Sequence, residues 1–394
     1  MKQTDGVATG IDVILSASSK WILLTALIFS QQGLAHATTP QNEIAPVDKA
    51  LTLAQIATTA GNDTLLVTAQ SGSTITAINL SKLLQIQVKD PLELISIVGV
   101  DRLRDLAISK TDEYPISDLV VPGGLSSEQL AAGANYADHG EEGGLESVFL
   151  FPKYSTPTAN SPAIPVRADQ LLDYEIEVCA RFDRNILSMA DFAKANVGLF
   201  LCGDFTDRAT LMRKIDKDNW ESGVGYTDAK SGTGLFPVGA FTVVPRDWSS
   251  FIDGIDLQLS VNGEVRQQDS AAKMLLKLDE ILALAFAGNT SMRWMFRGQD
   301  IPILKDGILY RGQSILTGTP EGVVFRPPGT LFIISNALKW LATGSFMNSS
   351  VSDYVIENYI ADRLAARTYL QPGDQISMMG TYLGATNIGI VSAR

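Results

Sequence analysis

The chain has 394 residues, of which 45% are hydrophobic and 19% charged, a composition typical of a globular protein with a sizeable core. This length is enough for one large domain with an appendage or for two domains. The formal net charge of −12 argues against a nucleic-acid partner, because binding to a polyanion requires a basic surface.

The N-terminal segment has the pattern of a secretory signal peptide. Lys20 precedes the apolar run 21–29, and polar residues then lead to Ala35-His36-Ala37. A basic residue, a short hydrophobic run and a small-x-small site predict a signal peptide over 1–37 and export to the periplasm or the medium. The apolar run is shorter than the ~20 residues that span a bilayer, so no membrane span is expected after processing. The alternatives are an uncleaved anchor or a misassigned start.

The processed chain contains few residues that could form a zinc cluster. Beyond residue 37 it has one histidine, His139, and two cysteines, Cys179 and Cys202. A zinc cluster of His and Cys ligands needs three or four such side chains and is therefore excluded. Both cysteines lie in apolar, strand-like runs, so we expect free buried thiols. A disulfide could form in an exported protein if their two strands are neighbours.

The first part of the processed chain predicts a small N-terminal domain over residues 38–125. Apolar runs alternate there with polar turns, and Pro122-Gly123-Gly124 marks its end. The remaining residues, 126–394, predict a catalytic domain in which β-rich runs predominate. The expected strands are 163–166, 174–180, 198–202, 241–244 and 255–261, with a hairpin at Asn262-Gly263.

Helical patterns are fewer in the second part of the chain. Stretches 189–195 and 271–286 have the apolar spacing of helices. Residues 336–367 also look helical and separate two strand-like regions, so we interpret them as an insertion into the catalytic domain. The predicted fold class is therefore mainly β, of the α+β type.

A strand with two alternating glutamates is the most specific local pattern. In the run 173–177, side chains alternate between faces, so Glu175 and Glu177 point to one side about 7 Å apart. Asp204 follows the apolar run 198–202 and could meet them. Three carboxylates without histidine form an all-oxygen site that suits Mg²⁺, Mn²⁺ or Ca²⁺. The alternatives are a solvated strand face for the glutamates and a simple turn at Asp204.

His139 is the candidate general base. Glu142 follows it by three residues, and one helical turn would bring the carboxylate beside the imidazole. A carboxylate in that position orients the ring and raises its basicity, as activation of water requires. The alternative is a surface or core histidine without a catalytic role.

Two cations and a turn could complete such a site. Arg208 lies shortly after the third carboxylate, and Lys230 lies in a glycine-rich loop. Either could hold a substrate carboxylate or stabilise developing negative charge. The strand and turn at 315–322 contain Gly318 and Thr319, whose backbone N–H groups and hydroxyl could also bind a carboxylate. Surface cations and an ordinary turn are the alternatives.

Taken together and in this order, these motifs resemble the fumarylacetoacetate hydrolase family. The resemblance covers roughly residues 126–334 and 369–394. It implies a mixed β-sandwich or β-roll core of the type found in that family, usually in a homodimer. The matching blocks are Asn135-Tyr136-Ala137-Asp138-His139, Asp173 to Glu177, Asp204 with Arg208, Lys230, Val261 to Glu264, Thr317-Gly318-Thr319-Pro320, and the closing segments 371–374 and 380–387.

The resemblance also implies roles for individual residues. The three carboxylates would bind Mg²⁺ or Mn²⁺. Members of the acylpyruvate hydrolase type use a His–Glu pair on a mobile lid to activate water, which corresponds to His139 and Glu142. The family's lysine near the metal corresponds to Lys230.

The predicted function is a metal-dependent hydrolase that cleaves a C–C bond in a small 2,4-dioxo acid, such as an acylpyruvate or fumarylpyruvate of aromatic catabolism. The cation would polarise the 2-oxo carbonyl, an activated water would attack the distal carbonyl, and the lysine would stabilise the departing enolate. A decarboxylase or hydratase/isomerase of 2-oxo acids on the same fold is the first alternative. A non-catalytic exported protein that binds a small acid is the second.

Overall fold

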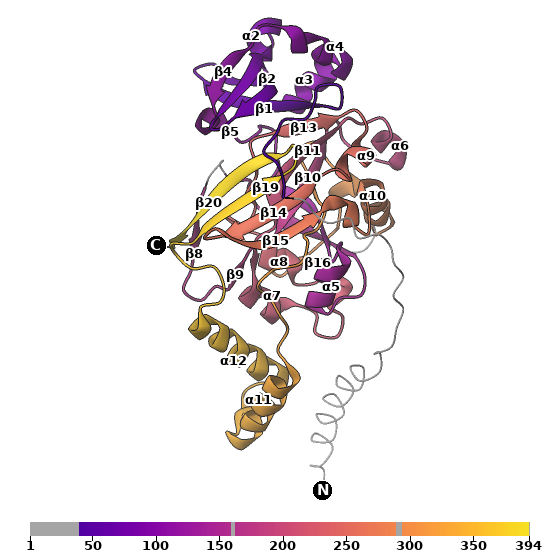
Figure 1. The fold of residues 1–394 in the computed structure, drawn as a ribbon. Helices are drawn as coiled ribbons and strands as arrows, with labels where there is room; N and C mark the ends of the chain where they lie inside the picture. The colour runs from indigo at the N-terminus through magenta and orange to yellow at the C-terminus, as the bar shows by residue number, and fades with distance from the viewer. Residues whose placement is uncertain (1–38, 159–161, 289–293, 394) are drawn as a thin grey trace, which may run out of the picture. The chain divides into compact units, whose positions relative to one another are not determined.

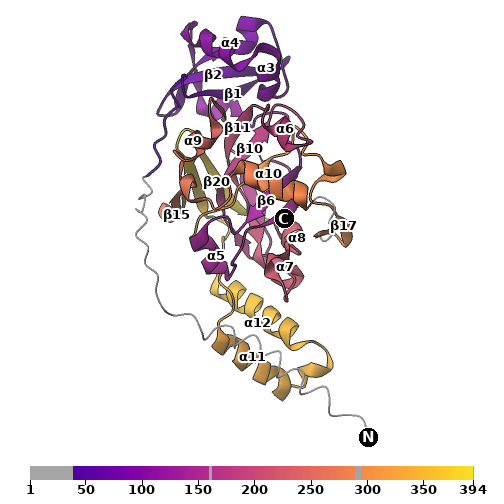
Figure 2. The same ribbon diagram turned by 90° about the vertical axis from the view of Figure 1, so that its right-hand side faces the viewer.

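The computed structural model describes residues 39–393, except for 159–161 and 289–293. The predicted signal peptide over 1–37 therefore lies outside the described residues. Within the described chain, Pro328–Asn358 form one compact unit and the other residues form a second, larger one. Figures 1 and 2 show mixed sheets and helices in the larger unit, which confirms the predicted α+β fold class.

The larger unit is built on an 11-stranded sheet with the strand order β4-β3-β2-β1-β13-β11-β10-β18-β6-β7, and β5 pairs with β1. All but one of the pairings that join these strands are antiparallel. The exception is the parallel pair of β18 and β6. The strands are β1 (Ala50–Thr58), β2 (Gly61–Ser71), β3 (Thr74–Asn79), β4 (Asp112–Pro115), β5 (Leu119–Val120), β6 (Glu128–Gly133), β7 (Phe149–Tyr154), β10 (Ile176–Phe182), β11 (Val197–Gly203), β13 (Thr242–Pro245) and β18 (Ile315–Leu316).

A five-stranded sheet packs against the large one, with the order β15-β14-β19-β20-β8. One apolar cluster contains Ile176 and Leu201 of the large sheet together with Leu257 and Met378 of the smaller one, so the two sheets enclose a common core. This is the sandwich that the sequence predicts. The remaining strands are β8 (Ala163–Val166), β14 (Asp256–Val261), β15 (Glu264–Ser270), β19 (Gln375–Gly380) and β20 (Gly384–Ser392), with the short pairs β9 (Leu172–Asp173) and β12 (Thr206–Asp207), and β16 (Trp294–Phe296) and β17 (Gln299–Ile301).

Helices surround the sheets of the larger unit. Figures 1 and 2 agree that α5, α7 and α8 lie together at one end of the sheets. The helices are α2 (Leu80–Leu84), α3 (Pro91–Val98), α4 (Val100–Asp105), α5 (Ala137–Gly143), α6 (Met189–Phe192), α7 (Arg208–Lys214), α8 (Tyr226–Lys230), α9 (Trp248–Ile252) and α10 (Leu278–Ala287).

The N-terminal segment supplies most of a second apolar cluster, which also includes Val244 of β13, and it shares the large sheet. Leu51 and Leu92 belong to this cluster, whereas β1 pairs with β13, with Leu51 opposite Val244. The sheet therefore crosses the boundary that the sequence predicts near residue 125. A buried ion pair also crosses it, because the guanidinium of Arg181 lies 3.0 Å from the carboxylate of Asp90.

The predicted strands and the hairpin agree with the structure to within two residues at each end. The predicted helix over 271–286 is wrong in its first part. Residues 271–273 form only a short 3₁₀ turn, and α10 begins at Leu278. The side chain of Glu280 accepts a hydrogen bond of 2.8 Å from the backbone N–H of Lys277, and this capping interaction fixes where the helix starts.

The unit Pro328–Asn358 contains α11 (Thr330–Ala342) and the first half of α12 (Val351–Ala366). The helices confirm the helical character predicted for 336–367, although the first helix starts earlier. Within the unit, the indole of Trp340 donates a hydrogen bond of 3.0 Å to the carbonyl oxygen of Ser349. Among the described residues, no helix combines the length and the apolar character needed to cross a membrane.

Candidate active site

Strand directions bring the chemically important segments to one edge of the large sheet. β6 and β18 are parallel, so the chain leaves both at the same edge, toward α5 and toward the turn 317–322. β10 is antiparallel to β18, and β11 is antiparallel to β10. The start of β10 and the end of β11 therefore lie at that edge as well, which explains how segments far apart in sequence converge.

The three predicted carboxylates meet at this edge. Glu177 lies in β10, Glu175 directly precedes it, and Asp204 directly follows β11. One oxygen atom from each lies within 4.8 Å of the others. The exposed fraction is 3% for Glu175 and 1% each for Glu177 and Asp204, so the alternative of a solvated strand face is wrong.

Lys230 and Arg208 neutralise part of this negative charge. The ammonium of Lys230, in α8, lies 2.5 Å from Glu175 Oε2 and 2.8 Å from Asp204 Oδ2. The guanidinium of Arg208, in α7, donates to Glu175 Oε1 at 2.6 Å and to Asp173 at 2.9 Å. Burial opposes ionisation of Glu175, but Lys230 and Arg208 hold its pKa well below the usual range.

Glu177 is the carboxylate whose negative charge is least offset by its neighbours. Its Oε2 accepts a hydrogen bond of 2.7 Å from the backbone N–H of Gly318. Burial raises its pKa well above the usual range, and the neighbouring charges of Asp204 and Glu175 raise it further. A divalent cation would relieve this repulsion, and the oxygen-only donor set suits Mg²⁺ or Mn²⁺. These residues therefore fit a divalent metal, although the structure does not specify which ion.

His139 and Glu142 lie on α5, one helical turn apart as predicted. His139 Nδ1 is 3.7 Å from Glu142 Oε2, which is longer than a hydrogen bond. The imidazole is close enough to Glu175 to help lower the pKa of that carboxyl. Glu142 in turn accepts a hydrogen bond of 3.0 Å from the backbone N–H of Gly322 and pairs with the guanidinium of Arg326.

These contacts decide the ionisation of Glu142. Burial opposes the charged form, but the imidazole of His139, the N–H of Gly322 and the charge of Arg326 together lower its pKa. The guanidinium of Arg326 is itself held by the carbonyl oxygen atoms of Val323 and Phe325, at 2.8 and 2.7 Å. It thus fixes α5 to the loop after the turn 317–322.

The turn 317–322 lies against β10. Gly318 has φ 97°, and a Cβ there would come within 2.8 Å of Asn135 Cβ, so the close approach requires glycine. The hydroxyl of Thr319 donates to the carbonyl of Ile176 at 2.8 Å and accepts from Gln267 at 2.9 Å. The polar groups of Gly318, Thr319 and Arg208 thus contact protein groups here, and their predicted role in binding substrate stays a prediction.

Residues 129–391 match the family model described as "Fumarylacetoacetate (FAA) hydrolase C-terminal". This match covers well over half of the chain. The chain belongs to the fumarylacetoacetate hydrolase family. The resemblance seen in the sequence is therefore confirmed, and with it the assignment to a family of enzymes.

Similar proteins in this family include tautomerases and isomerases. "Oxaloacetate tautomerase FAHD1, mitochondrial" from Pongo abelii is 30% identical over 201 residues, which cover 49% of this chain and 80% of that protein. The Bos taurus protein of the same name is 29% identical over 203 residues, with 49% and 80% coverage. These names do not confirm the predicted hydrolase activity.

Solved structures show the same fold. The 2-hydroxyhepta-2,4-diene-1,7-dioate isomerase from Mycobacterium marinum aligns with a TM-score of 0.51 at 17% identity, covering 87% of this chain and 98% of that one. The 5-carboxymethyl-2-hydroxymuconate delta-isomerase from Mycobacterium smegmatis aligns with a TM-score of 0.51 at 18% identity, covering 87% and 100%. At these identities the likeness establishes the fold alone.

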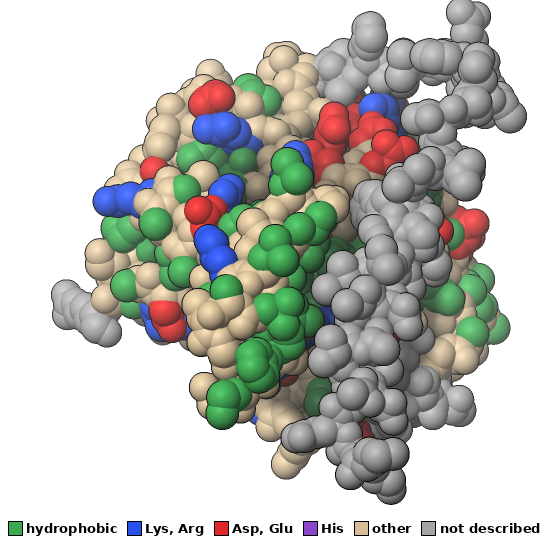
Figure 3. All heavy atoms as spheres, turned by 90° about the horizontal axis from the view of Figure 1, so that it is seen from below, with side chains coloured by type: hydrophobic (Ala, Val, Ile, Leu, Met, Phe, Trp, Pro, Cys, Tyr) green, Lys and Arg blue, Asp and Glu red, His purple; other side chains and the backbone are tan. Residues whose placement is uncertain are grey.

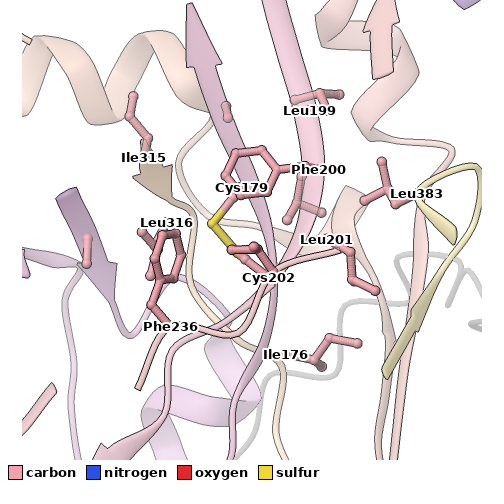
Figure 4. Packing of buried hydrophobic residues seen from close by; sticks show 14 of the residues in the cluster. Ile176, Cys179, Leu199, Phe200, Leu201, Cys202, Phe236, Ile315, Leu316 and Leu383 are labelled. Atoms are coloured by element: carbon pink, nitrogen blue, oxygen red, sulfur yellow. A yellow bond between two sulfur atoms is a disulfide. The ribbon is translucent and has the colours of Figure 1, made fainter. Parts of the chain in front are cut away.

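In this member of the fumarylacetoacetate hydrolase family a disulfide joins the two strands that lead to the carboxylates. Cys179 of β10 is bonded to Cys202 of β11, with the Cα atoms 5.9 Å apart (Figure 4). The expectation of free thiols is therefore wrong. The reason is tertiary, because β10 and β11 are antiparallel neighbours in which Cys202 lies opposite Glu177. The bond thus lies two residues from Glu177 on one strand and from Asp204 on the other.

The sequence interpretation missed Lys153, on β7. Its side chain is fully buried, and its ammonium donates to Asp204 Oδ1 at 2.6 Å and to the carbonyl oxygen atoms of Lys230 and Leu235. Burial lowers the pKa of Lys153, and the nearby carboxylate of Asp204 opposes that shift. The sequence does contain a sign of this role, because Lys153 lies inside the apolar run 149–154 and lysine is rarely buried without a partner.

Proposed function

We propose that the protein interconverts the keto and enol forms of a small 2-oxo dicarboxylic acid of the oxaloacetate type, with the help of a divalent cation. The observation that carries this proposal is the buried group of Glu175, Glu177 and Asp204 with the ammonium of Lys230 between two of them. Such a site suits a substrate that carries several oxygen atoms and develops negative charge. The names of the similar tautomerases support the reaction type.

The residues around the carboxylates have the properties that tautomerisation requires. A bound cation would supply Lewis-acid polarisation of the substrate carbonyl. Lys230 and Lys153 place two buried ammonium groups at the same carboxylate, Asp204, where they can stabilise a developing enolate. His139 offers a group that can take the proton from carbon, and the substrate oxygen gains a proton in its place. The carboxylate of Glu142 lies 3.7 Å from that imidazole, close enough to attract it when it is protonated.

Hydrolysis of a C–C bond in a 2,4-dioxo acid is the second candidate. The pairing of His139 with Glu142 favours it, because an imidazole beside a carboxylate can activate a water molecule. Both reactions pass through an enolate, so they share the cation site and differ in whether water attacks. The two candidates are therefore distinguished by their products.

We further propose that the protein is exported and acts as a homodimer. The disulfide supports export, because such bonds persist in oxidising compartments and are rare in the cytosol. The pattern of residues 20–37 points the same way. We propose the homodimer because homodimers are usual in the family.

The test uses the processed chain, 38–394, with Mg²⁺ or Mn²⁺. Decay of the ultraviolet absorbance of enol-oxaloacetate would report tautomerisation, and acylpyruvate and fumarylpyruvate would be offered in parallel. We expect accelerated tautomerisation that falls by at least ~100-fold in Lys230→Met, because a buried cation beside a developing enolate is removed. Asp169→Asn, at an exposed carboxylate, is the control. Cleavage of the 2,4-dioxo acids without tautomerisation would establish the second candidate, and no acceleration with either metal would refute the proposal.

A further inference from the structure

The helix α11 carries four large aliphatic side chains on one exposed face. Leu331, Ile334, Leu338 and Leu341 are spaced by three, four and three residues, so they lie along the same side of the helix. Their exposed fractions are 84%, 44%, 62% and 53%. Isolated exposed leucines are common on proteins, but a continuous row of them marks an interaction surface.

The connection that follows the helix extends this face. Phe346 and Met347 are exposed by 55% and 79%. The ring of Phe346 lies 6.0 Å from that of Trp340, so an aromatic pair borders the aliphatic row. We call the six residues 331, 334, 338, 341, 346 and 347 the α11 face. Hydrophobic side chains gathered in a row are also visible on the surface viewed from below (Figure 3).

The inner side of α11 differs from this face. Asn336 and Ala337, one polar and one small, are buried, whereas Phe332, Ile333 and Trp340 are half-buried. An ordinary surface helix turns its large aliphatic residues inward and its polar residues outward. In α11 the aliphatic row is instead exposed within the part of the chain that the structure describes, although exposure of such a row is unfavourable in water.

The charged residues in and around α11 indicate which kind of partner could bind the α11 face. Between Glu321 and Asp353 the sequence contains no acidic residue, and its only charged residues there are Arg326 and Lys339. Arg326 is paired with Glu142, so Lys339 is the charged residue of α11 itself. Anionic lipid headgroups repel acidic protein surfaces and attract basic ones, so a helix that carries a lysine and no acidic residue is suited to approach them.

We propose that the α11 face docks on the surface of a lipid bilayer that contains anionic headgroups. The aliphatic row would enter the boundary between headgroups and acyl chains, as in helices that lie in the membrane interface. Trp340 and Phe346 are of the residue types that favour this boundary. Lys339, next to Leu338 in the sequence, could extend its ammonium to a headgroup. The protein would then be held at a membrane surface through this face.

The experiment measures co-sedimentation of the processed chain, 38–394, with vesicles. One set consists of phosphatidylcholine alone and the other of phosphatidylcholine with phosphatidylglycerol. We expect binding to the mixed vesicles that falls at least ~10-fold in the double variant Leu331→Asp/Leu338→Asp, because two apolar side chains leave the interface and two acids enter it. Lys339→Glu should weaken binding to the mixed vesicles and leave the weaker binding to pure phosphatidylcholine unchanged.

The matched control places two aspartates at exposed apolar positions of the other unit, in Ile97→Asp/Ile108→Asp. These side chains are exposed by 56% and 95%. The control has the same change in net charge and should bind vesicles almost as well as the unaltered chain. Circular dichroism of each variant would show that the helices are retained.

Three outcomes would overturn the proposal. The unaltered chain could fail to bind either vesicle, or the control could lose binding as much as the Leu331/Leu338 variant. Alternatively, light scattering could show that the Leu331/Leu338 substitutions dissociate a dimer while vesicle binding persists, which would make the α11 face a contact between two copies of the chain. Catalytic activity is not a readout here, so the result is independent of the proposed function.

Discussion

The side chain of Asp204 contacts two buried ammonium groups, those of Lys153 and Lys230, at 2.6 and 2.8 Å. All three side chains are almost fully buried. In such a site each charge depends on its neighbours, because an unpaired buried charge costs several kcal/mol. Asp204 therefore has two functions, as a candidate metal ligand and as the counter-ion of both lysines.

We expect Asp204→Asn to abolish binding of Mg²⁺ and Mn²⁺. The amide keeps the size of the side chain but removes one of three negative ligands. It also leaves the buried ammonium of Lys153 without its counter-ion and the ammonium of Lys230 with Glu175 alone, so the free energy of unfolding should fall by about 3–5 kcal/mol. Calorimetric titration and urea denaturation measure the two effects, with Asp169→Asn at an exposed position as the control. Unchanged metal affinity would show that this group of carboxylates is not the metal site.

The contact between Arg326 and Glu142 gives a prediction about pH. The charge of Arg326 is one of the influences that lower the pKa of Glu142. Its removal in Arg326→Gln should therefore raise that pKa, and the carboxylate should become protonated at a higher pH. If ionised Glu142 is needed to orient His139, the acid limb of the pH–rate profile should move upward in pH.

The control for this measurement is Arg363→Gln, which removes another partly exposed arginine paired with a carboxylate. It should leave the profile unchanged. An acid limb that stays in place in Arg326→Gln, or moves to lower pH, would contradict a positioning role for Arg326.

At the scale of secondary-structure elements, β10 and β11 lead to all three carboxylates and are joined by the Cys179–Cys202 disulfide. The bond lies within the apolar core among side chains such as Phe200 and Phe236 (Figure 4). A crosslink at this point restricts the separation of the two strands. We therefore expect loss of the bond to loosen the strand ends that carry the carboxylates.

Replacement of both cysteines, in Cys179→Ala/Cys202→Ala, should lower the free energy of unfolding by about 3 kcal/mol, since the bond closes a loop with a sequence separation of 23. Metal affinity should weaken as well, because the ligand-bearing strand ends gain freedom. Urea denaturation and metal titration with and without reductant provide the measurements. Reductant should affect the original chain and leave the double variant unchanged, and equal effects on both would contradict this prediction.

Helix boundaries within the chain depend on capping interactions as well as on apolar spacing. The pattern over 271–286 predicts one helix. The hydrogen bond between Glu280 and the N–H of Lys277 instead makes α10 begin at Leu278, near the middle of that stretch. Residues 271–273, directly after β15, instead form a short 3₁₀ turn. Periodicity identified the helix, and local hydrogen bonding determined where it begins.

For the whole molecule, the predicted processing site gives a direct test. The exported protein should begin near Thr38, because Ala35-His36-Ala37 has the small-x-small pattern that signal peptidases cleave. The intact mass of protein recovered from the periplasm or the medium would establish this. A product that retains Met1 in a membrane fraction would instead indicate an uncleaved anchor. The predicted homodimer stays a prediction that sedimentation can check.

Sequence alone determined those properties that depend on residue type and local order. The alternation of Glu175 and Glu177 on one strand, the one-turn spacing of His139 and Glu142, and the ordered motifs of the family are all local patterns. They were enough to predict the fold class, the family and the group of carboxylates. Local geometry follows from backbone periodicity, which is why these inferences could be made without a structure.

Only the tertiary structure decided which distant residues meet. Lys153 reaches Asp204, Arg326 reaches Glu142, and Cys179 bonds to Cys202 because strand order and direction bring their elements together. Sequence spacing cannot reveal such contacts, since they depend on how β6, β10, β11 and β18 are arranged in the sheet. The exposure of the α11 face was also decided by the tertiary structure. Periodicity shows that a helix has an apolar side but not whether that side is covered.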